Sequence, residues 1–311
     1  MFLKSIHLKN FRNIRDQYLD LNPKFNLLIG ANAQGKTNTV EAAYLFATGK
    51  SFRTSEFRDM MMWNSASTCV DSETEGRLGK DNLKVTLNEA KKEFFKNGKR
   101  IRPGNTKGLC AVLFAPEEIL LLRGQPAARR KYIDTLISQV FPVHGMLTRK
   151  YSKIVFQRNK LLQDRELGQS KKILNLKPWN QQLVEVGSKL VCERNKWINL
   201  LNTFLPDRYF AIAPNDDEAR FVYSPSLGEE VLNMGEDGIA DMMGLRLLER
   251  ENDELVRGTS LVGPHRDDIK AMVGERALKV YGSQGQHRTF TLALKIAEMD
   301  FIKREIGETP T

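Results

Sequence analysis

The spacing of apolar residues changes near residue 116, and this change divides the chain into two kinds of predicted structure. Before it, short apolar or alternating stretches predict strands, and two of them are joined by Asn97-Gly98, a pair that favours a type I′ hairpin turn. After it, apolar residues recur every three or four positions, as in amphipathic helices. The predicted strands cover residues 2–8, 25–29, 82–87, 93–96, 99–102 and 111–114, and the predicted long helices cover residues 127–140, 143–165 and 179–205.

Both patterns occur again beyond residue 205. Alternation predicts strands at residues 209–213 and 221–224, and helical spacing predicts helices at about 238–256 and from 284 to about 306. We therefore predict an α/β fold with two lobes. Residues 1–115, completed by residues 206–311, form the first lobe, and residues 116–205 form a helical lobe. Heptad repeats are not sustained, so no long coiled coil is expected.

The first candidate for chemistry is a glycine-containing segment that fits the pattern G-x-x-x-x-G-K-[ST] at every constrained position. The apolar run before it predicts a short buried strand, and residues 38–47 predict a helix that ends at Gly49, which is the context that this motif requires. Its glycines would let backbone N–H groups surround a triphosphate at a helix N-terminus. Lys36 would reach the β- and γ-phosphates, and the Thr37 hydroxyl would hold Mg²⁺. The predicted ATP-binding residues are Gly30, Ala31, Asn32, Ala33, Gln34, Gly35, Lys36 and Thr37.

Two cations that follow the predicted helix have no unique interpretation. Lys50 and Arg53 lie close in sequence to this segment. They are equally compatible with phosphate contacts and with capping of the helix C-terminus, where positive charge is favourable.

A second anion site is predicted at the start of the last helix. Ser283 can cap this helix, and the cluster Ser283, Gln284, Gly285 and Gln286 offers a hydroxyl, backbone amides and the helix dipole. Upstream, Gly263-Pro264-His265-Arg266-Asp267-Asp268 holds two adjacent carboxylates. The residues before them are not the buried aliphatics of a metal-binding strand, so we assign Asp267 and Asp268 to a turn and not to a metal site. His265 is more consistent with a structural role than with a role near the γ-phosphate.

Charge points to a polyanionic partner. The net charge is +10, and residues 123–177 contain thirteen Lys or Arg against three acidic residues. Such a concentration is typical of nucleic-acid binding, although it is also compatible with a solvated helical face. Without interleaved aromatic residues it favours sequence-independent phosphate contacts. The candidate DNA-binding residues are Arg129, Arg130, Lys131, Arg149, Lys150, Lys153, Arg158 and Lys160.

Neither a secretory signal nor a stretch of about twenty apolar residues occurs, so a membrane location is not expected. Cys69, Cys110 and Cys192 are far apart and form no C-x-x-C pair. Three separate cysteines argue against a disulfide framework or a zinc site, and we expect a cytoplasmic protein.

The chain resembles the ATP-binding-cassette ATPases, and within them the RecF family. The resemblance is carried by the segments Leu8–Asn13, Gly30–Thr37, Gly263–Asp268 and Ser283–Arg288, with a further likeness between Phe114 and Arg130. It implies a head like those of structural-maintenance and Rad50 proteins, with a helical lobe in place of a long coiled coil. On this basis Arg12 and Asn13 join the candidate cofactor-binding residues.

The resemblance also implies a function. RecF-like proteins bind ATP with Mg²⁺ and form an ATP-dependent homodimer, in which Ser283 of one subunit would face the γ-phosphate held by the other. The dimer clamps double-stranded DNA near single-strand gaps and, with RecR- and RecO-type mediator proteins, supports loading of the RecA recombinase. A slow, DNA-stimulated ATPase activity would act as a timer for the clamp.

The sequence departs from this family at its end. Members continue past the last helix into an aliphatic strand with acidic residues that holds Mg²⁺ and positions water, and this strand is absent after Gly307. We therefore expect a C-terminally truncated chain with no catalytic residue of its own and poor ATP turnover. Two other interpretations remain open: a P-loop kinase of small molecules and the nucleotide-binding subunit of a membrane transporter.

Overall fold

The computed structural model describes residues 1–77, 79–102, 109–115, 118–166, 175–214 and 216–311. The chain divides into two compact units. The first unit comprises residues 1–113, 138–142 and 298–311, and the second comprises residues 114–137 and 143–297. Residues 206–297 therefore group with the helical segment, whereas the sequence placed them with the first lobe. The reason is local packing, since the small sheet within residues 219–277 contacts the helices α5 and α6 of the same unit.

The first unit is built on an antiparallel sheet in the order β2-β1-β3-β4-β5-β6. Its strands are β1 (Phe2–Phe11), β2 (Ile14–Asp20), β3 (Ser67–Gly76), β4 (Gly79–Asn88), β5 (Lys92–Lys96) and β6 (Lys99–Ile101). The predicted hairpin is confirmed, because Asn97 and Gly98 both have positive φ angles between β5 and β6. The helix α1 (Lys36–Thr48) and the short turn η1 (Phe57–Met60) complete this unit.

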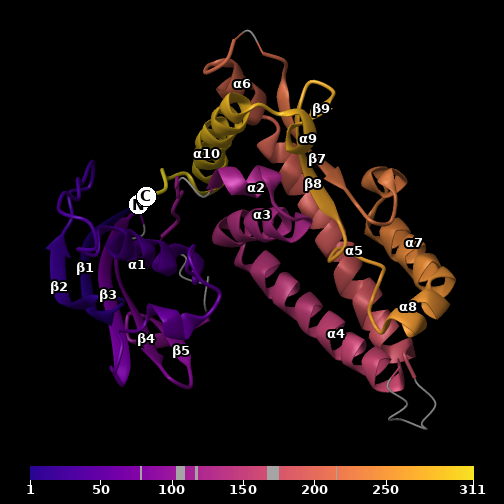
Figure 1. Ribbon diagram of the computed structural model, residues 1–311, viewed down its shortest axis with the longest axis horizontal. Coiled ribbons are helices and arrows are strands. Elements are labelled where there is room, and N and C mark those ends of the chain that lie inside the picture. The colour runs from indigo at the N-terminus through magenta and orange to yellow at the C-terminus, as the bar shows by residue number, and fades with distance from the viewer. Residues whose placement is uncertain (78, 103–108, 116–117, 167–174, 215) are drawn as a thin grey trace. The chain divides into compact units, whose positions relative to one another are not determined.

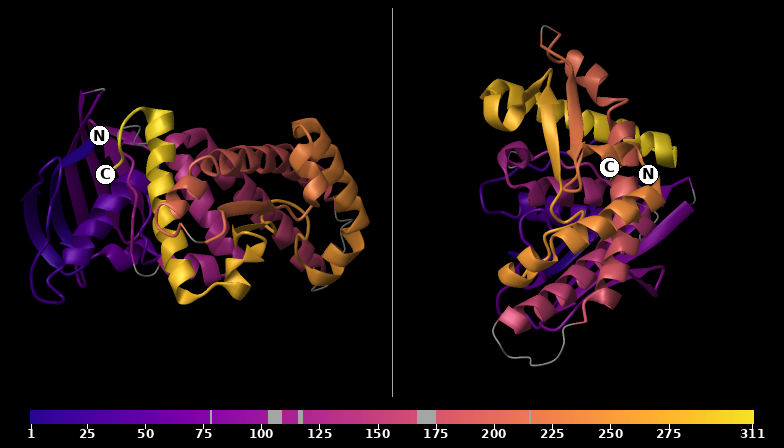
Figure 2. Two further views of the ribbon diagram at one scale, coloured as in Figure 1. Left: turned by 90° about the horizontal axis from the view of Figure 1, so that it is seen from above. Right: turned by 90° about the vertical axis from the view of Figure 1, so that its right-hand side faces the viewer.

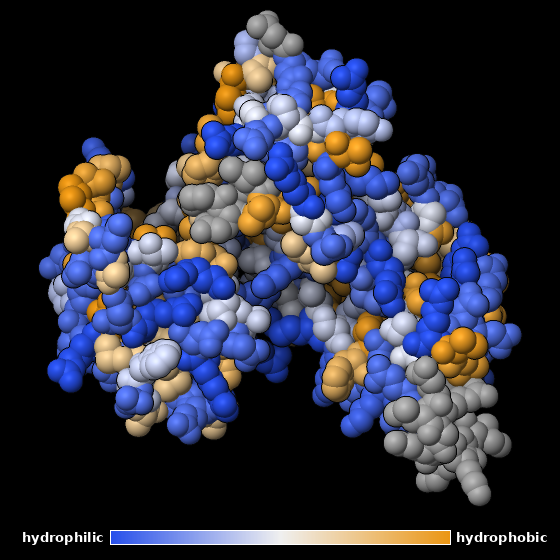
Figure 3. All heavy atoms as spheres, viewed as in Figure 1, coloured by the Kyte–Doolittle hydropathy of each residue, from blue (hydrophilic) through white to orange (hydrophobic). Residues whose placement is uncertain are grey.

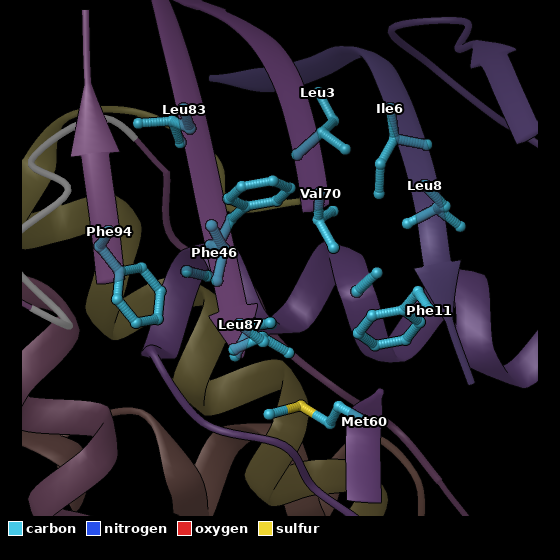
Figure 4. Packing of buried hydrophobic residues seen from close by; sticks show 14 of the residues in the cluster. Leu3, Ile6, Leu8, Phe11, Phe46, Met60, Val70, Leu83, Leu87 and Phe94 are labelled. Atoms are coloured by element: carbon cyan, nitrogen blue, oxygen red, sulfur yellow. The ribbon is translucent and has the colours of Figure 1, made fainter. Parts of the chain in front are cut away.

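The core of the first unit lies between the sheet and α1. Figure 4 shows Phe46 of α1 among side chains of the strands, including Val70, Leu83 and Leu87. The predicted inward positions Leu3, Ile6 and Leu8 of β1 are buried as expected. Leu3 shares the buried face with Ile6 and Leu8 because the register of β1 shifts between Leu3 and Ser5. This face carries α1, whose first residue, Lys36, lies near the end of the glycine-containing segment.

The second unit is mainly helical (Figures 1 and 2). Its helices are α2 (Ile119–Arg123), α3 (Pro126–Val140), α4 (Pro142–Glu166), α5 (Lys177–Leu201), α6 (Leu205–Phe210), α7 (Glu236–Glu249), α8 (Glu251–Arg257), α9 (Leu278–Tyr281) and α10 (Gln284–Ile306), with the turn η3 (Glu229–Asn233); the final residues of α3 and α10 belong to the first unit. A small antiparallel sheet has the order β7 (Ala219–Ser224), β8 (Asp268–Val273) and β9 (Arg276–Ala277). The three long predicted helices are present as α3, α4 and α5, and α10 matches its predicted bounds.

Three predicted strands are wrong. Residues 25–29 and 111–114 form no strand, and residues 205–210 are helical where a strand was expected at 209–213. In the first case the apolar run is exposed, with Phe25 at 74% and Ile29 at 82% of their full accessibility. An apolar run becomes a strand only when a neighbouring strand takes its backbone hydrogen bonds, and none of the described strands pairs with residues 25–29.

The surface in Figure 3 is mostly hydrophilic, and its apolar residues form separate patches. None of the helices in the described part of the chain is long and apolar enough to cross a bilayer.

Candidate nucleotide-binding site

The glycine-containing segment forms an exposed loop that leads directly into α1. Gly35 precedes the helix with a φ of 95°, and a Cβ at this position would lie 2.9 Å from Ile14 Cγ1. Both the left-handed backbone and the close approach of β2 therefore require glycine here. The helix ends as predicted at Gly49, whose φ is 72° and whose N–H donates to the Leu45 carbonyl.

The polar groups of this loop are available to a ligand. Among the described residues, none accepts a hydrogen bond from the backbone N–H groups of residues 31–36 or from the Thr37 hydroxyl. The Lys36 ammonium donates to the carbonyls of Gly30 at 2.7 Å and Ala31 at 2.6 Å, so it is held against the same loop. Free N–H groups, a helix N-terminus and a fixed cation form a phosphate-binding arrangement.

Two further candidate residues lie beside this loop. Asn13 Nδ2 donates to the Ala33 carbonyl at 2.5 Å, and Asn13 Oδ1 accepts from Asn38 Nδ2 at 2.7 Å. Arg12 donates through Nε and Nη2 to the two carboxylate oxygens of Glu41, at 3.0 and 2.7 Å. The turn between β1 and β2 is thus connected to the loop by side chains.

The contacts of Arg53 distinguish between its two interpretations, a position near the phosphate-binding loop and a cap at the C-terminus of α1. Its Nη1 donates to Asn38 Oδ1 at 2.7 Å, one residue beyond Thr37. This places its guanidinium at the N-terminal turn of α1 and not at the C-terminal carbonyls. Sequence reasoning missed Glu41 and Asn38; the available signal for Glu41 was a carboxylate four residues before Leu45, on the same apolar face of the helix.

The predicted cap of α10 is present in the second unit. Ser283 Oγ accepts from the Gln286 N–H, and Gln286 Oε1 accepts from the Ser283 N–H, both at 3.1 Å. This is a capping box. Ser283, Gln284 and Gly285 are exposed, whereas Gln286 also donates to Asp216. The exposed helix start retains N–H groups for an anion.

The segment Gly263–Asp268 is a structural centre of the second unit. Arg194 Nη1 donates to the Pro264 carbonyl at 2.6 Å, and its other nitrogens bind both oxygens of Asp134. Asp267 is buried and accepts from Tyr223 and from the Ser226 N–H, and Asp268 begins β8. Both carboxylates have protein partners.

Both ring nitrogens of His265 have hydrogen-bond partners within the protein. Tyr151 and the Ser260 carbonyl lie 2.8 and 3.1 Å from its Nδ1 and Nε2. Nε2 therefore carries the proton, and Nδ1 accepts from the Tyr151 hydroxyl. Burial, outweighing the hydrogen bond to Ser260, lowers the pKa of His265 from 6.5 to about 4.

Three of the eight candidate DNA-binding residues are held by the protein itself. Arg129 is buried and binds both oxygens of Asp268, and Arg158 is fully buried against Glu254 at 2.5 Å. Arg130 donates to the Asp267 carbonyl. The expectation of exposed faces is therefore wrong for Arg129 and Arg158, because helical spacing alone did not show which cations meet buried carboxylates. The remaining candidates are exposed: Lys131 on α3, and Arg149, Lys150, Lys153 and Lys160 on α4.

A magnesium site would depend on few protein groups. Within the described ranges, no cluster of three or more His, Cys, Asp or Glu side chains is arranged to hold a metal. The exposed Thr37 hydroxyl, which has no partner there, fits a cation that takes most of its ligands from phosphate and water.

Sequence comparison places the chain among known ATPases. The family model described as "AAA ATPase domain" matches residues 1–196. The "DNA replication and repair protein RecF" of Halothermothrix orenii is 35% identical over 312 residues, covering this whole chain and 83% of the relative. That of Natranaerobius thermophilus is 36% identical over 327 residues, covering this whole chain and 82% of the relative.

Solved structures give the same result. A structure described as "the recombination mediator protein RecF-ATP in RecFOR pathway" matches with a TM-score of 0.92 and 30% identity, over 100% of this chain and 83% of that one. A RecF-ATPrS structure matches with a TM-score of 0.92 and 29% identity, over 99% and 83% of the two chains. These matches confirm the predicted fold class, an α/β ATPase head with a helical lobe.

Proposed function

Because the chain belongs to the RecF family of DNA replication and repair proteins, we propose that it binds ATP at Gly30–Thr37 and that the bound nucleotide controls its affinity for DNA. The observation that carries this proposal is the loop itself. The N–H groups of residues 31–36 donate to no residue in the described part of the chain, Lys36 is fixed against the loop, and α1 begins at Lys36. Bound ATP would meet backbone donors, the Lys36 ammonium and the helix dipole together.

Mg²⁺ would accompany the nucleotide, with Thr37 as its protein ligand. The cation would neutralise phosphate charge, while Lys36 and the N–H groups orient the phosphates. Asn13, which holds the Ala33 carbonyl, would keep the loop in shape.

ATP would also join two copies of the chain. The exposed start of α10 offers N–H groups and the Ser283 hydroxyl, which suit the γ-phosphate of a nucleotide held by a second subunit. Nucleotide binding would then shift the population from monomer to homodimer, because ATP satisfies surfaces on both subunits.

DNA would bind to the exposed cations of α4. Arg149, Lys150, Lys153 and Lys160 are exposed. Lys150 lies 3.7 Å from Glu185, and this ion pair is weak because both side chains are exposed. Contacts with phosphates would make binding independent of sequence and dependent on salt. We expect double-stranded or gapped DNA as the ligand, in the cytoplasm.

The partners would be the mediator proteins of recombinational repair. The matched structures are described as RecF of the RecFOR pathway, which supports RecR- and RecO-type partners and an indirect role in RecA loading. Neither the kinase nor the transporter interpretation has an observation in its favour.

The first experiment measures molar mass by light scattering, with and without ATP–Mg²⁺. We expect the mass to double with ATP and to stay monomeric for Ser283→Arg, while both proteins bind a fluorescent ATP analogue. A monomer under all conditions, with proven ATP binding, would contradict the dimer. No ATP binding would contradict the proposed site.

The second experiment tests the DNA surface by fluorescence anisotropy of a labelled duplex at several salt concentrations. Replacing Arg149, Lys150 and Lys153 with Glu should weaken binding to all sequences and reduce the slope of log affinity against log salt by about 3. The matched control replaces Lys91, Lys99 and Arg100, exposed cations on and beside the β5–β6 hairpin, with Glu. Equal losses in both variants would show that only total charge matters.

A further inference from the structure

One buried carboxylate gathers three segments around the phosphate-binding loop. Glu41 lies in α1 and is fully buried. It accepts two hydrogen bonds from Arg12 and one from the Ser51 hydroxyl, and its Oε2 lies 3.6 Å from Arg53 Nη1. These partners come from the turn after β1 and from the loop after α1. Glu41 therefore fixes both segments against the helix that carries Lys36 and Thr37.

The energetic reason for this arrangement is the cost of burying a charge. An ionised carboxylate is stable away from water only when cations and hydrogen-bond donors surround it. Glu41 has two guanidinium groups and a hydroxyl as partners. Arg12 holds a φ of 55°, which non-glycine residues rarely adopt, and its paired hydrogen bonds to Glu41 offset that strain.

A series of hydrogen-bonded side chains connects Arg53, a partner of Glu41, to the glycine-containing loop. Arg53 donates to Asn38 Oδ1, Asn38 donates to Asn13 Oδ1, and Asn13 donates to the Ala33 carbonyl, with distances of 2.7, 2.7 and 2.5 Å. Ala33 has a φ of 64°, so the loop needs support in this conformation. Each link uses one donor and one acceptor, so a rotation at any member breaks the next contact.

We propose that Glu41 is a positioning residue of the nucleotide site, which acts through Arg53, Asn38 and Asn13 to hold the loop ready for phosphate. This inference rests on the proposed ATP binding and adds a residue that touches no phosphate. Glu41 cannot reach the ligand, because its side chain is covered by Arg12, Ser51 and Arg53. Its effect is preorganisation: the loop conformation is formed before the nucleotide arrives.

The test compares nucleotide affinities of the native chain with Glu41→Gln, Asn38→Ala and the double variant, by displacement of a fluorescent ATP analogue. We expect ATP to bind about 10-fold more weakly to each single variant, and the double variant to lose about 10-fold rather than 100-fold, because both changes break one chain. AMP affinity should change less than ATP affinity, since AMP lacks the β- and γ-phosphates that the loop and Lys36 would contact.

Asn38→Ala keeps the buried ion pairs, so it remains informative if Glu41→Gln folds poorly. The matched control is Glu308→Gln, which removes a carboxylate paired with the Met1 amino group at 2.7 Å in the same unit. It should lower stability without changing ATP affinity. Proteolytic cleavage within residues 30–37 should become faster in Glu41→Gln and keep its native rate in Glu308→Gln.

The outcomes separate this inference from the function it rests on. Additive losses, or native affinity in Asn38→Ala, would overturn the positioning role while ATP binding stands. Failure of the native chain to bind ATP would overturn the proposed function, and the positioning role would fall with it.

Discussion

The Gly30–Thr37 loop and the Gly263–Asp268 segment both combine glycine with charged residues, but they differ in how far their polar groups are already paired. The loop is exposed, and the N–H groups of residues 31–36 donate to none of the described residues. In the second segment Pro264, His265, Arg266, Asp267 and Asp268 all have hydrogen-bond partners within the protein.

This difference separates a binding motif from a structural one. Unpaired donors in an exposed loop are solvated and ready to exchange water for phosphate. Buried groups that are fully paired have no capacity left for a ligand, and they stabilise the fold because removing one partner leaves another unpaired. Two replacements of a cation by methionine test this distinction: Lys36→Met in the loop and Arg194→Met at a partner of the second segment. The same effects of both on stability and on ATP binding would contradict it.

Arg194→Met should have the largest effect, a loss of about 3–5 kcal/mol in the free energy of unfolding. Arg194 is buried, binds both oxygens of Asp134 and the Pro264 carbonyl, and lies 3.7 Å from Asp267. Burial favours a raised pKa for Asp134, but Arg194 and His144 outweigh it and hold this pKa well below its usual range. Urea unfolding followed by tryptophan fluorescence measures the loss. A loss below about 1 kcal/mol would mean that water reaches these carboxylates.

Acidification should weaken the same region through His265. Its pKa is about 4 in the folded chain and 6.5 ordinarily, so the unfolded chain takes up this proton first as the pH falls. The contribution of neutral His265 is complete above pH 6.5 and is lost between pH 6.5 and 4, at about 1.4 kcal/mol per pH unit and about 3 kcal/mol in all.

The measurement is the unfolding free energy of the native chain and of His265→Gln between pH 4 and 7. Gln keeps a donor and an acceptor but has no proton to gain, so its curve should be flatter over this range. Burial raises the pKa of Asp267, which acts in the opposite direction in both proteins and is removed by the comparison. Parallel curves would show that His265 takes up its proton without a cost in the folded chain.

The features that follow from local pattern were predictable, and those that depend on distant partners were not. The Asn97-Gly98 turn, the Gly49 end of α1 and the Ser283 cap are each set by a few neighbouring residues. By contrast, the local pattern of Phe25–Ile29 predicts a buried strand, but whether this segment forms one depends on pairing with another strand, which no local pattern specifies. Arg129 and Arg158 read as surface cations because Asp268 and Glu254 lie 139 and 96 residues away in sequence.

The same limit on prediction from local sequence applies to the candidate site. The phosphate loop is recognisable from eight consecutive residues, whereas Glu41 is not, because its partners Arg12 and Arg53 lie on other segments. A buried carboxylate in a helix indicates that cations must be near, but not which ones.

Lys36→Met should weaken ATP binding by about 2–3 kcal/mol, roughly 100-fold, because it removes a charge-assisted contact to phosphate. The unfolding free energy without nucleotide should change by less than about 0.5 kcal/mol, since Lys36 is only partly buried and donates to two loop carbonyls. Titration with a fluorescent ATP analogue and urea unfolding provide the two values. A loss of stability comparable with that of Arg194→Met would remove the distinction between the two motifs.

Ser283→Ala should lower the free energy of unfolding by about 1 kcal/mol, and it tests a residue that combines features of both kinds of motif. Ser283 Oγ already accepts from the Gln286 N–H, as a structural group would, but its hydroxyl hydrogen has no acceptor among the residues that the structure describes. Alanine removes both functions, whereas threonine keeps the cap. Hydrogen exchange in the first turn of α10 should therefore rise in Ser283→Ala and stay native in Ser283→Thr, and ATP-dependent dimerisation should fall in Ser283→Ala. If dimerisation survives in Ser283→Ala while exchange rises, the serine serves the helix alone, and the backbone N–H groups of residues 284 and 285 remain as the ligand-binding groups of this helix start.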